Sequence, residues 1–140
     1  MKPFARICES RVLRRSIVVL CGPKVELKRL FFDPEGPFRD FDVSCAAHRR
    51  TWRKLEDAWH CTVDSPDCAS LAFTMAYRGD AFIVMPKWDS RYFVHEAYHA
   101  AQALLRAVGT EDEELGAYVV EWLFEEICWD ERPGGKGKRK

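Results

Sequence analysis

The sequence predicts an α+β fold in which a small β-sheet packs against two C-terminal helices. Short apolar segments at 16–21, 71–77 and 81–85 are typical of strands. After residue 89 the apolar side chains recur every three or four residues, which is typical of helices, and this spacing continues to about residue 127. We expect these strands and helices to share one core.

A chain of 140 residues is long enough for a domain with its own core. We expect one domain over residues 1–131 and a disordered basic tail over residues 132–140. No stretch approaches the roughly 18 apolar residues of a membrane span, and no signal-peptide pattern is present, so we expect a soluble, cytoplasmic protein without a membrane partner. The six cysteines are scattered without a CxxC pair, which favours reduced thiols.

The formal net charge of zero conceals an uneven distribution of charge along the chain. Residues 1–60 carry 13 Lys and Arg against 8 Asp and Glu, whereas residues 111–131 include nine acidic side chains and no basic one. Residues 132–140 then add five basic side chains. Without that tail the chain has 17 positive and 22 negative side chains, a mildly acidic balance that gives no case for nucleic-acid binding.

The first half of the chain predicts one strand and two helices. Residues 16–21 form an apolar strand that Gly22-Pro23 ends, and residues 24–32 show helical spacing. Residues 44–59 form a charged amphipathic stretch that predicts a second helix. Its basic side chains are expected to form a solvated face: Arg49, Arg50, Arg53 and Lys54.

Residues 71–85 predict a β-hairpin, because larger apolar side chains alternate with smaller or polar ones up to a turn at Arg78-Gly79-Asp80. Pro86 follows the returning strand, and proline is tolerated at a strand end or on a sheet edge. We therefore expect residues 81–85 to lie at the side of the sheet. An edge strand at this place would suit the docking of an extended peptide.

The first C-terminal helix is predicted from about residue 90 to Val108. Asp89 or Ser90 is suited to cap its start, and Gly109 is suited to end it. Its apolar side chains recur on one face, which we expect to pack on the sheet.

The second C-terminal helix follows after a very short turn. Thr110 is expected to cap it, with Glu113 completing a Thr-x-x-Glu capping box. Gly116 lies inside this helix and costs about 1 kcal/mol of helix propensity. We therefore expect another element to approach Gly116 closely.

His95 and His99 carry the clearest chemical pattern in the chain. They are four residues apart on a predicted helix, so both imidazoles project from one face and can hold a single Zn²⁺ in two tetrahedral positions. Glu96 completes the HExxH pattern, in which the glutamate takes a proton from zinc-bound water and passes it to the leaving amine. The alternative is two histidines packed within a helix pair without a metal.

A third zinc ligand is expected from the acidic second helix, and two carboxylates compete for the role. With Glu113 engaged in the capping box, Glu114 is the first free carboxylate; Tyr118, one turn later, could stabilise an oxyanion or pack in the core. A tight antiparallel hairpin would leave Glu114 about 9 Å from His99 along the axis and would set Glu121 opposite the histidines. Apolar neighbours would then bury Glu121. Only obliquely crossed helices favour Glu114.

The segment from Phe93 to Ala101, followed by Glu114, Ala117 and Tyr118, resembles small HExxH metallopeptidase-like proteins of phages and prophages. Those proteins resemble gluzincins, so the resemblance implies a zincin-like fold and a zinc site of His95, His99 and Glu114. It covers about residues 81–128. Gln102 and Leu105 stand where a metzincin would have Gly and His, which excludes that class.

We therefore expect a zinc-dependent hydrolase that acts on a peptide or protein substrate, with Glu96 as general base and acid. Two other functions stay open. One is a non-catalytic zinc-binding or protein-interaction module, and the other is a zinc hydrolase acting on a bond other than a peptide.

Overall fold

The computed structural model describes residues 3–39, 46–67 and 70–131. Four strands and four helices occur in this part of the chain, which confirms the mixed α and β class with a small sheet. The elements are, in chain order, β1 Phe4–Ser10, β2 Arg15–Cys21, α1 Lys24–Phe32, α2 Ala46–Thr62, β3 Phe73–Tyr77, β4 Asp80–Met85, α3 Ser90–Ala107 and α4 Glu113–Glu131. The tail expected over residues 132–140 lies outside the described residues.

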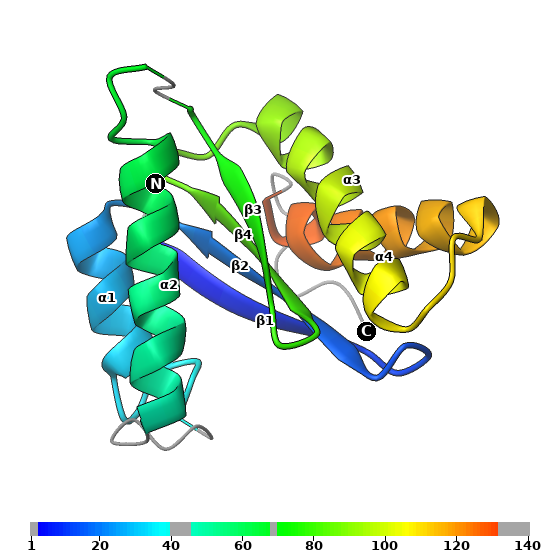
Figure 1. Cartoon of the computed structure of the whole chain (residues 1–140), viewed down its shortest axis with the longest axis horizontal. Coiled ribbons are helices and arrows are strands. Elements are labelled where there is room, and N and C mark those ends of the chain that lie inside the picture. The colour runs from blue at the N-terminus through cyan, green and yellow to red at the C-terminus, as the bar shows by residue number, and fades with distance from the viewer. Residues whose placement is uncertain (1–2, 40–45, 68–69, 132–140) are drawn as a thin grey trace.

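The sheet separates two layers of helices (Figure 1). Its strand order is β1-β2-β4-β3, with β2 and β4 parallel and both outer strands antiparallel to their neighbours. Helices α1 and α2 cover one face, and α3 and α4 cover the other. The two central strands are therefore covered on both sides.

Alternation within the central strands explains this layering. Ile17 and Ile83 belong to the core shared with α3 and α4, whereas Val18 and Val84 belong to the core under α1 and α2. Because successive side chains of a strand point to opposite faces, a strand buried on both faces reads as a continuous apolar run. The apolar runs at 16–21 and 81–85 therefore reflect burial of β2 and β4 on both faces of the sheet.

The expected place of residues 81–85 at the side of the sheet is wrong. Strand β4 lies between β2 and β3 instead of at the side, and β3 is an edge strand. Pro86 follows β4 after its last residue, so its missing N–H removes no hydrogen bond of the sheet. Strand β1 was not predicted, because most of its side chains are only partly buried and its apolar pattern is weak.

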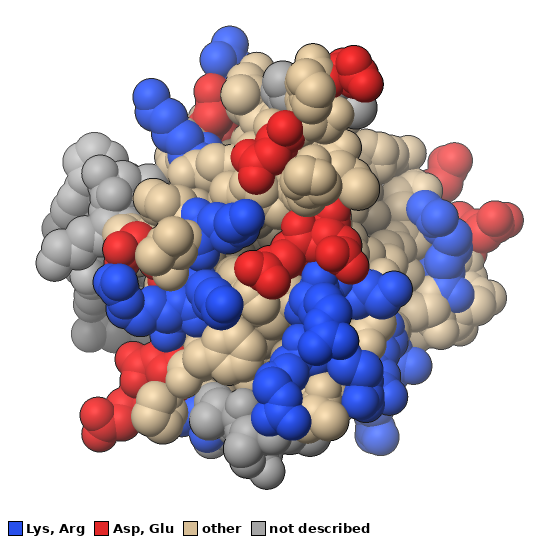
Figure 2. All heavy atoms as spheres, turned by 60° about the vertical axis from the view of Figure 1, so that its left-hand side comes forward, with Lys and Arg blue, Asp and Glu red and all other residues tan. Residues whose placement is uncertain are grey.

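The basic side chains of α2 form the solvated face that the sequence predicts. Arg49, Arg50, Arg53 and Lys54 are all exposed, while Trp52 on the same helix is buried against the sheet. Lys and Arg side chains gather with some acidic ones on the face turned forward in Figure 2, the side of α1 and α2. This face lies across the sheet from α3 and α4.

The turn between α3 and α4 differs from the predicted capping box. Gly109, at φ +80°, follows α3 as expected of a helix-ending glycine. However, α4 begins at Glu113, and Oδ1 of Asp112 accepts hydrogen bonds from the backbone N–H of Glu114 at 2.9 Å and of Leu115 at 3.2 Å. Asp112 therefore caps α4 in place of Thr110, and Glu113 has no capping role.

The close approach expected at Gly116 is confirmed. A Cβ atom at this position would lie 3.1 Å from Cδ1 of Leu105, a buried residue of α3. The missing side chain thus allows the two helices to pack closely. They cross obliquely instead of forming a tight antiparallel hairpin (Figure 1).

Two further expectations concern membrane spans and cysteines. No helix in the described part of the chain is both long and apolar enough to span a bilayer. Cys8, Cys21 and Cys61 are not in disulfide bonds. Burial raises the pKa of the Cys8 thiol to about 12, so this thiol stays protonated and unreactive at neutral pH.

Candidate functional site

Helix α3 positions the candidate site by burying one face and exposing the other. Asp89 caps its start, as predicted, and accepts a hydrogen bond from the backbone N–H of Arg91 at 2.9 Å. Hydrogen bonds from the side chain and backbone of Arg91 hold the pKa of Asp89 below its usual value. Phe93 and Ala97 lie fully buried on the face toward the sheet, so the opposite face is left to solvent.

His95 and His99 lie on the exposed face of α3, one turn apart. Their rings meet at 80°, and the two Nε2 atoms face each other at 3.2 Å. Without a metal, this contact is a hydrogen bond in which the protonated Nε2 of one ring donates to the unprotonated Nε2 of the other. The structure therefore brings both predicted histidines together through the same ring nitrogen.

Glu96 points from α3 toward the sheet and is only 7% exposed. Its Oε1 atom accepts a hydrogen bond from Oγ1 of Thr74, on the edge strand β3, at 2.7 Å. The same hydroxyl lies 3.1 Å from the backbone oxygen of Glu96. A hydroxyl has one hydrogen, so the shorter contact with the carboxylate is the stronger bond. Thr74 thus fixes the carboxylate beside the two histidines.

A cleft runs between β3 and the exposed face of α3. It consists of two hollows of about 430 Å³ and 590 Å³. Both are lined by Ala72, His95 and Glu96; the first also reaches His99 and Thr74, and the second reaches Arg91. We call these two neighbouring hollows the β3–α3 cleft. It places both histidines and the glutamate at the wall of a groove that borders an edge strand.

The acidic residues of α4 do not join the histidines. Glu114 is exposed, and neither it nor Tyr118, which is 59% exposed, lines the β3–α3 cleft. Glu121, which a tight hairpin would bury opposite the histidines, is exposed and lines a separate groove between α3 and α4. In residues 3–39, 46–67 and 70–127, no group of three or more His, Cys, Asp or Glu side chains is arranged to hold a metal ion.

Thr74 is the site residue that the sequence pattern did not reveal. The strand prediction rested on the alternating apolar residues of 71–77 and treated the residues between them as smaller or polar fillers. Of these apolar residues, Phe73, Met75 and Tyr77 pack toward α2. The period of two does place Thr74 on the opposite face, toward α3. That Thr74 contacts Glu96 depends on how α3 crosses β3, which the local sequence pattern does not contain.

No protein-family model, curated protein or solved structure matches this chain. The structure adds evidence about function through the geometry of the chain's own residues. That geometry consists of the paired Nε2 atoms, the buried carboxylate held by Thr74, and the cleft along the edge strand.

Proposed function

We propose that this chain is a zinc-dependent hydrolase of the zincin type that cleaves peptide bonds. The observation that carries the proposal is the 3.2 Å separation of the Nε2 atoms of His95 and His99. Two nitrogen ligands of one tetrahedral zinc, each at 2.0–2.1 Å from the metal, lie about 3.3 Å apart. An exposed hydrogen bond between two imidazoles adds little stability, whereas the same convergence suits a shared metal ion.

The donor set fits zinc with one ligand still to be supplied. Imidazole nitrogens and a carboxylate are usual zinc ligands, and a catalytic site keeps one further position open for water. Bound zinc would lower the pKa of such a water toward about 7 and polarise a carbonyl oxygen.

We propose Glu114 as the third ligand, as the resemblance to the phage HExxH proteins implies. Two features support this choice: α3 and α4 cross obliquely, and the exposed Glu114 side chain has no buried contacts to give up. Its carboxylate is not grouped with the histidines in this structure.

Glu96 is suited to move the proton in peptide hydrolysis. It lies next to His95 at the wall of the β3–α3 cleft, where its carboxylate can accept a proton from an attacking water and return it to the leaving amine. Thr74 acts as a positioning residue, because its hydrogen bond fixes one carboxylate oxygen and leaves the other for the proton. A general base works best when its geometry is set before the reaction.

Strand β3 is suited to bind the substrate backbone. It is an edge strand that pairs with β4 among the described strands, and it borders the cleft that holds Glu96 and the histidines. An extended peptide can add to such an edge through main-chain hydrogen bonds, which are independent of sequence. The role that the sequence suggested for residues 81–85 therefore passes to β3.

A test of the proposed function is zinc-dependent cleavage of a broad peptide library, read by mass spectrometry. We expect the zinc-loaded protein to cleave library peptides, a chelator to stop cleavage, and added zinc to restore it. The chelated protein should keep its helical circular dichroism, because the core is built without the metal. A zinc-loaded protein that cleaves no library peptide would contradict peptidase activity.

Replacement of Thr74 by valine tests the positioning role. Valine matches threonine in shape but cannot donate a hydrogen bond, and a bond to a charged group contributes about 1.5–3 kcal/mol. We expect kcat to fall by about tenfold to a hundredfold, with little change in KM, because a carboxylate that is no longer held in place is less often oriented for the proton transfer. Thr74→Ser keeps the hydroxyl and should restore most of the rate. Equal rates for wild type and Thr74→Val would show that Thr74 has no positioning role.

The alternative is a non-catalytic zinc-binding or protein-interaction module. It is favoured by one observation: among the described residues, no third ligand stands with the histidines. In that case Glu96 and Thr74 would only fasten α3 to the sheet, and the substitution of Glu96 described in the Discussion separates the two functions.

A further inference from the structure

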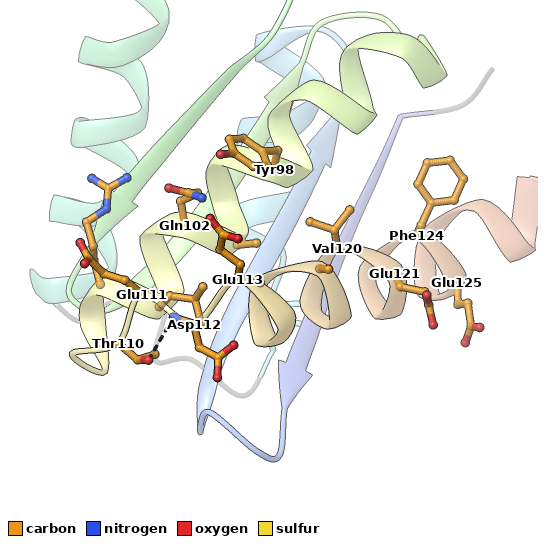
Figure 3. Close-up of a pocket in the computed structure, with 15 residues that line it drawn as sticks. Tyr98, Gln102, Thr110, Glu111, Asp112, Glu113, Val120, Glu121, Phe124 and Glu125 are labelled. Atoms are coloured by element: carbon orange, nitrogen blue, oxygen red, sulfur yellow. Dashed lines mark hydrogen bonds between the residues drawn. The ribbon is translucent and has the colours of Figure 1, made fainter.

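A large groove lies away from the histidines, between α3 and α4. Its volume is about 1220 Å³, and neither His95 nor His99 lines it (Figure 3). We call it the α3–α4 groove. Its floor is apolar and comes from both helices, with Leu105 on α3 and Ala117, Val120 and Phe124 on α4.

The rim of the α3–α4 groove is strongly acidic. Five carboxylates line it, against one basic side chain, Arg106. Three of them lie where the chain passes from α3 to α4: Glu111, Asp112 and Glu113 (Figure 3). The other two, Glu121 and Glu125, lie farther along α4. A groove with an apolar floor and an acidic rim is complementary to a ligand that is apolar on one side and basic on the other.

We propose that the α3–α4 groove docks a basic amphipathic helix of a partner protein. Its volume exceeds the roughly 300–1,000 Å³ of small-molecule pockets, which favours a peptide segment over a metabolite. Grooves between two helices bind amphipathic helices through apolar side chains at spacings of three and four residues. Lys and Arg on the flanks of such a helix would meet the acidic rim.

Two other occupants fit the groove less well. Residues 132–140 of this chain carry five basic side chains, but Pro133 is their only apolar side chain, so they match the rim and not the floor. A second copy could offer its most basic helix, α2, but the apolar residues Trp52, Leu55 and Trp59 of that helix are already buried on the sheet.

The α3–α4 groove and the β3–α3 cleft flank the same exposed ridge of α3. Tyr98 lines the groove and is 56% exposed, with its ring centre 5.9 Å from that of His99. Arg106 lines both spaces. A docked helix would therefore lie beside the histidines, yet its binding needs neither zinc nor catalysis.

The test uses the full chain and three labelled peptides in fluorescence anisotropy. The first peptide carries Leu at helical spacing of three and four with Lys elsewhere, the second replaces Lys by Glu, and the third replaces Leu by Ser. We expect the first to bind at least about tenfold more tightly than either of the others. Equal binding of the second or the third would overturn the proposal.

Substitutions then locate the binding surface. Ala117 is exposed on the groove floor, so Ala117→Trp should fill the groove without entering the core, and Glu121→Lys should reverse one rim charge. We expect each substitution to weaken binding of the first peptide by at least about tenfold. The matched controls Ala46→Trp and Glu35→Lys change exposed residues outside the groove and should leave binding unchanged.

Three results would overturn the docking proposal. The first is an equal loss in the controls and the groove variants, which would indicate general charge attraction. The second is tighter peptide binding after removal of residues 132–140, which would make that segment the occupant. The third is a dimer in analytical ultracentrifugation that Ala117→Trp dissociates, which would make the occupant a second copy.

Discussion

Replacement of Glu96 by glutamine is expected to lower the rate of peptide hydrolysis by a factor of about 10²–10⁴. The amide has nearly the shape of the carboxylate, and its oxygen can still accept the hydrogen bond that Thr74 donates to Oε1. It cannot accept the proton of an attacking water at neutral pH. The rate should be measured with the best peptide from the library, at equal zinc content for both proteins.

Stability and metal content are the controls for this substitution. We expect Glu96→Gln to keep the melting temperature and the zinc content of the wild type, since the Thr74 contact is retained. Glu35→Gln, at an exposed loop position, should change neither rate nor stability. Wild type and Glu96→Gln that cleave at the same rate would assign the site to a non-catalytic zinc protein.

Replacement of Glu114 by alanine is expected to weaken zinc binding by more than about a hundredfold, because loss of a direct ligand exceeds the 10–100-fold effect of groups behind the ligands. Glu113→Ala and Glu121→Ala are matched controls on the same helix. Both residues are exposed and line the α3–α4 groove, so neither is expected to change zinc affinity by more than a few-fold.

The measurement is a zinc titration against a competing chelator for the three variants. A large loss in Glu121→Ala alone would make Glu121 the third ligand. Small and equal losses in all three variants would show that none of these carboxylates binds the metal.

The elements with strong local signals could be predicted from the sequence. Strand β2, helix α1 and helix α3 begin and end within a residue or two of their predicted limits, because apolar spacing and capping residues such as Asp89 are local features. Gly116 was also informative, since a helix tolerates glycine where another helix approaches. The α+β class follows from these elements.

Features that depend on pairing between distant segments could not be predicted. The place of β4 inside the sheet depends on its parallel pairing with β2, more than 60 residues earlier, and the proline after it gave no information about that neighbour. The cap of α4 was misplaced because Thr110 and Asp112 are both good capping residues, and the path of the loop decides between them.

The candidate site also combines local features, which the sequence predicts, with features that depend on distant segments. The spacing of His95 and His99 on one helix is local, so their convergence was predictable. The bond between Thr74 and Glu96 joins residues 22 positions apart and depends on how α3 crosses β3. The relation of Glu114 to the histidines depends on the crossing of α3 and α4 and on the metal itself, so its role stays a prediction.

The most direct test of the central claim is the zinc content of the purified protein, measured by elemental analysis after loading and removal of free metal. We expect about one zinc per chain in the wild type and in His60→Ala, a matched change at an exposed histidine of α2, and almost none in His99→Ala. No zinc in the wild type, or one zinc per chain in His99→Ala, would contradict a metal site built on His95 and His99.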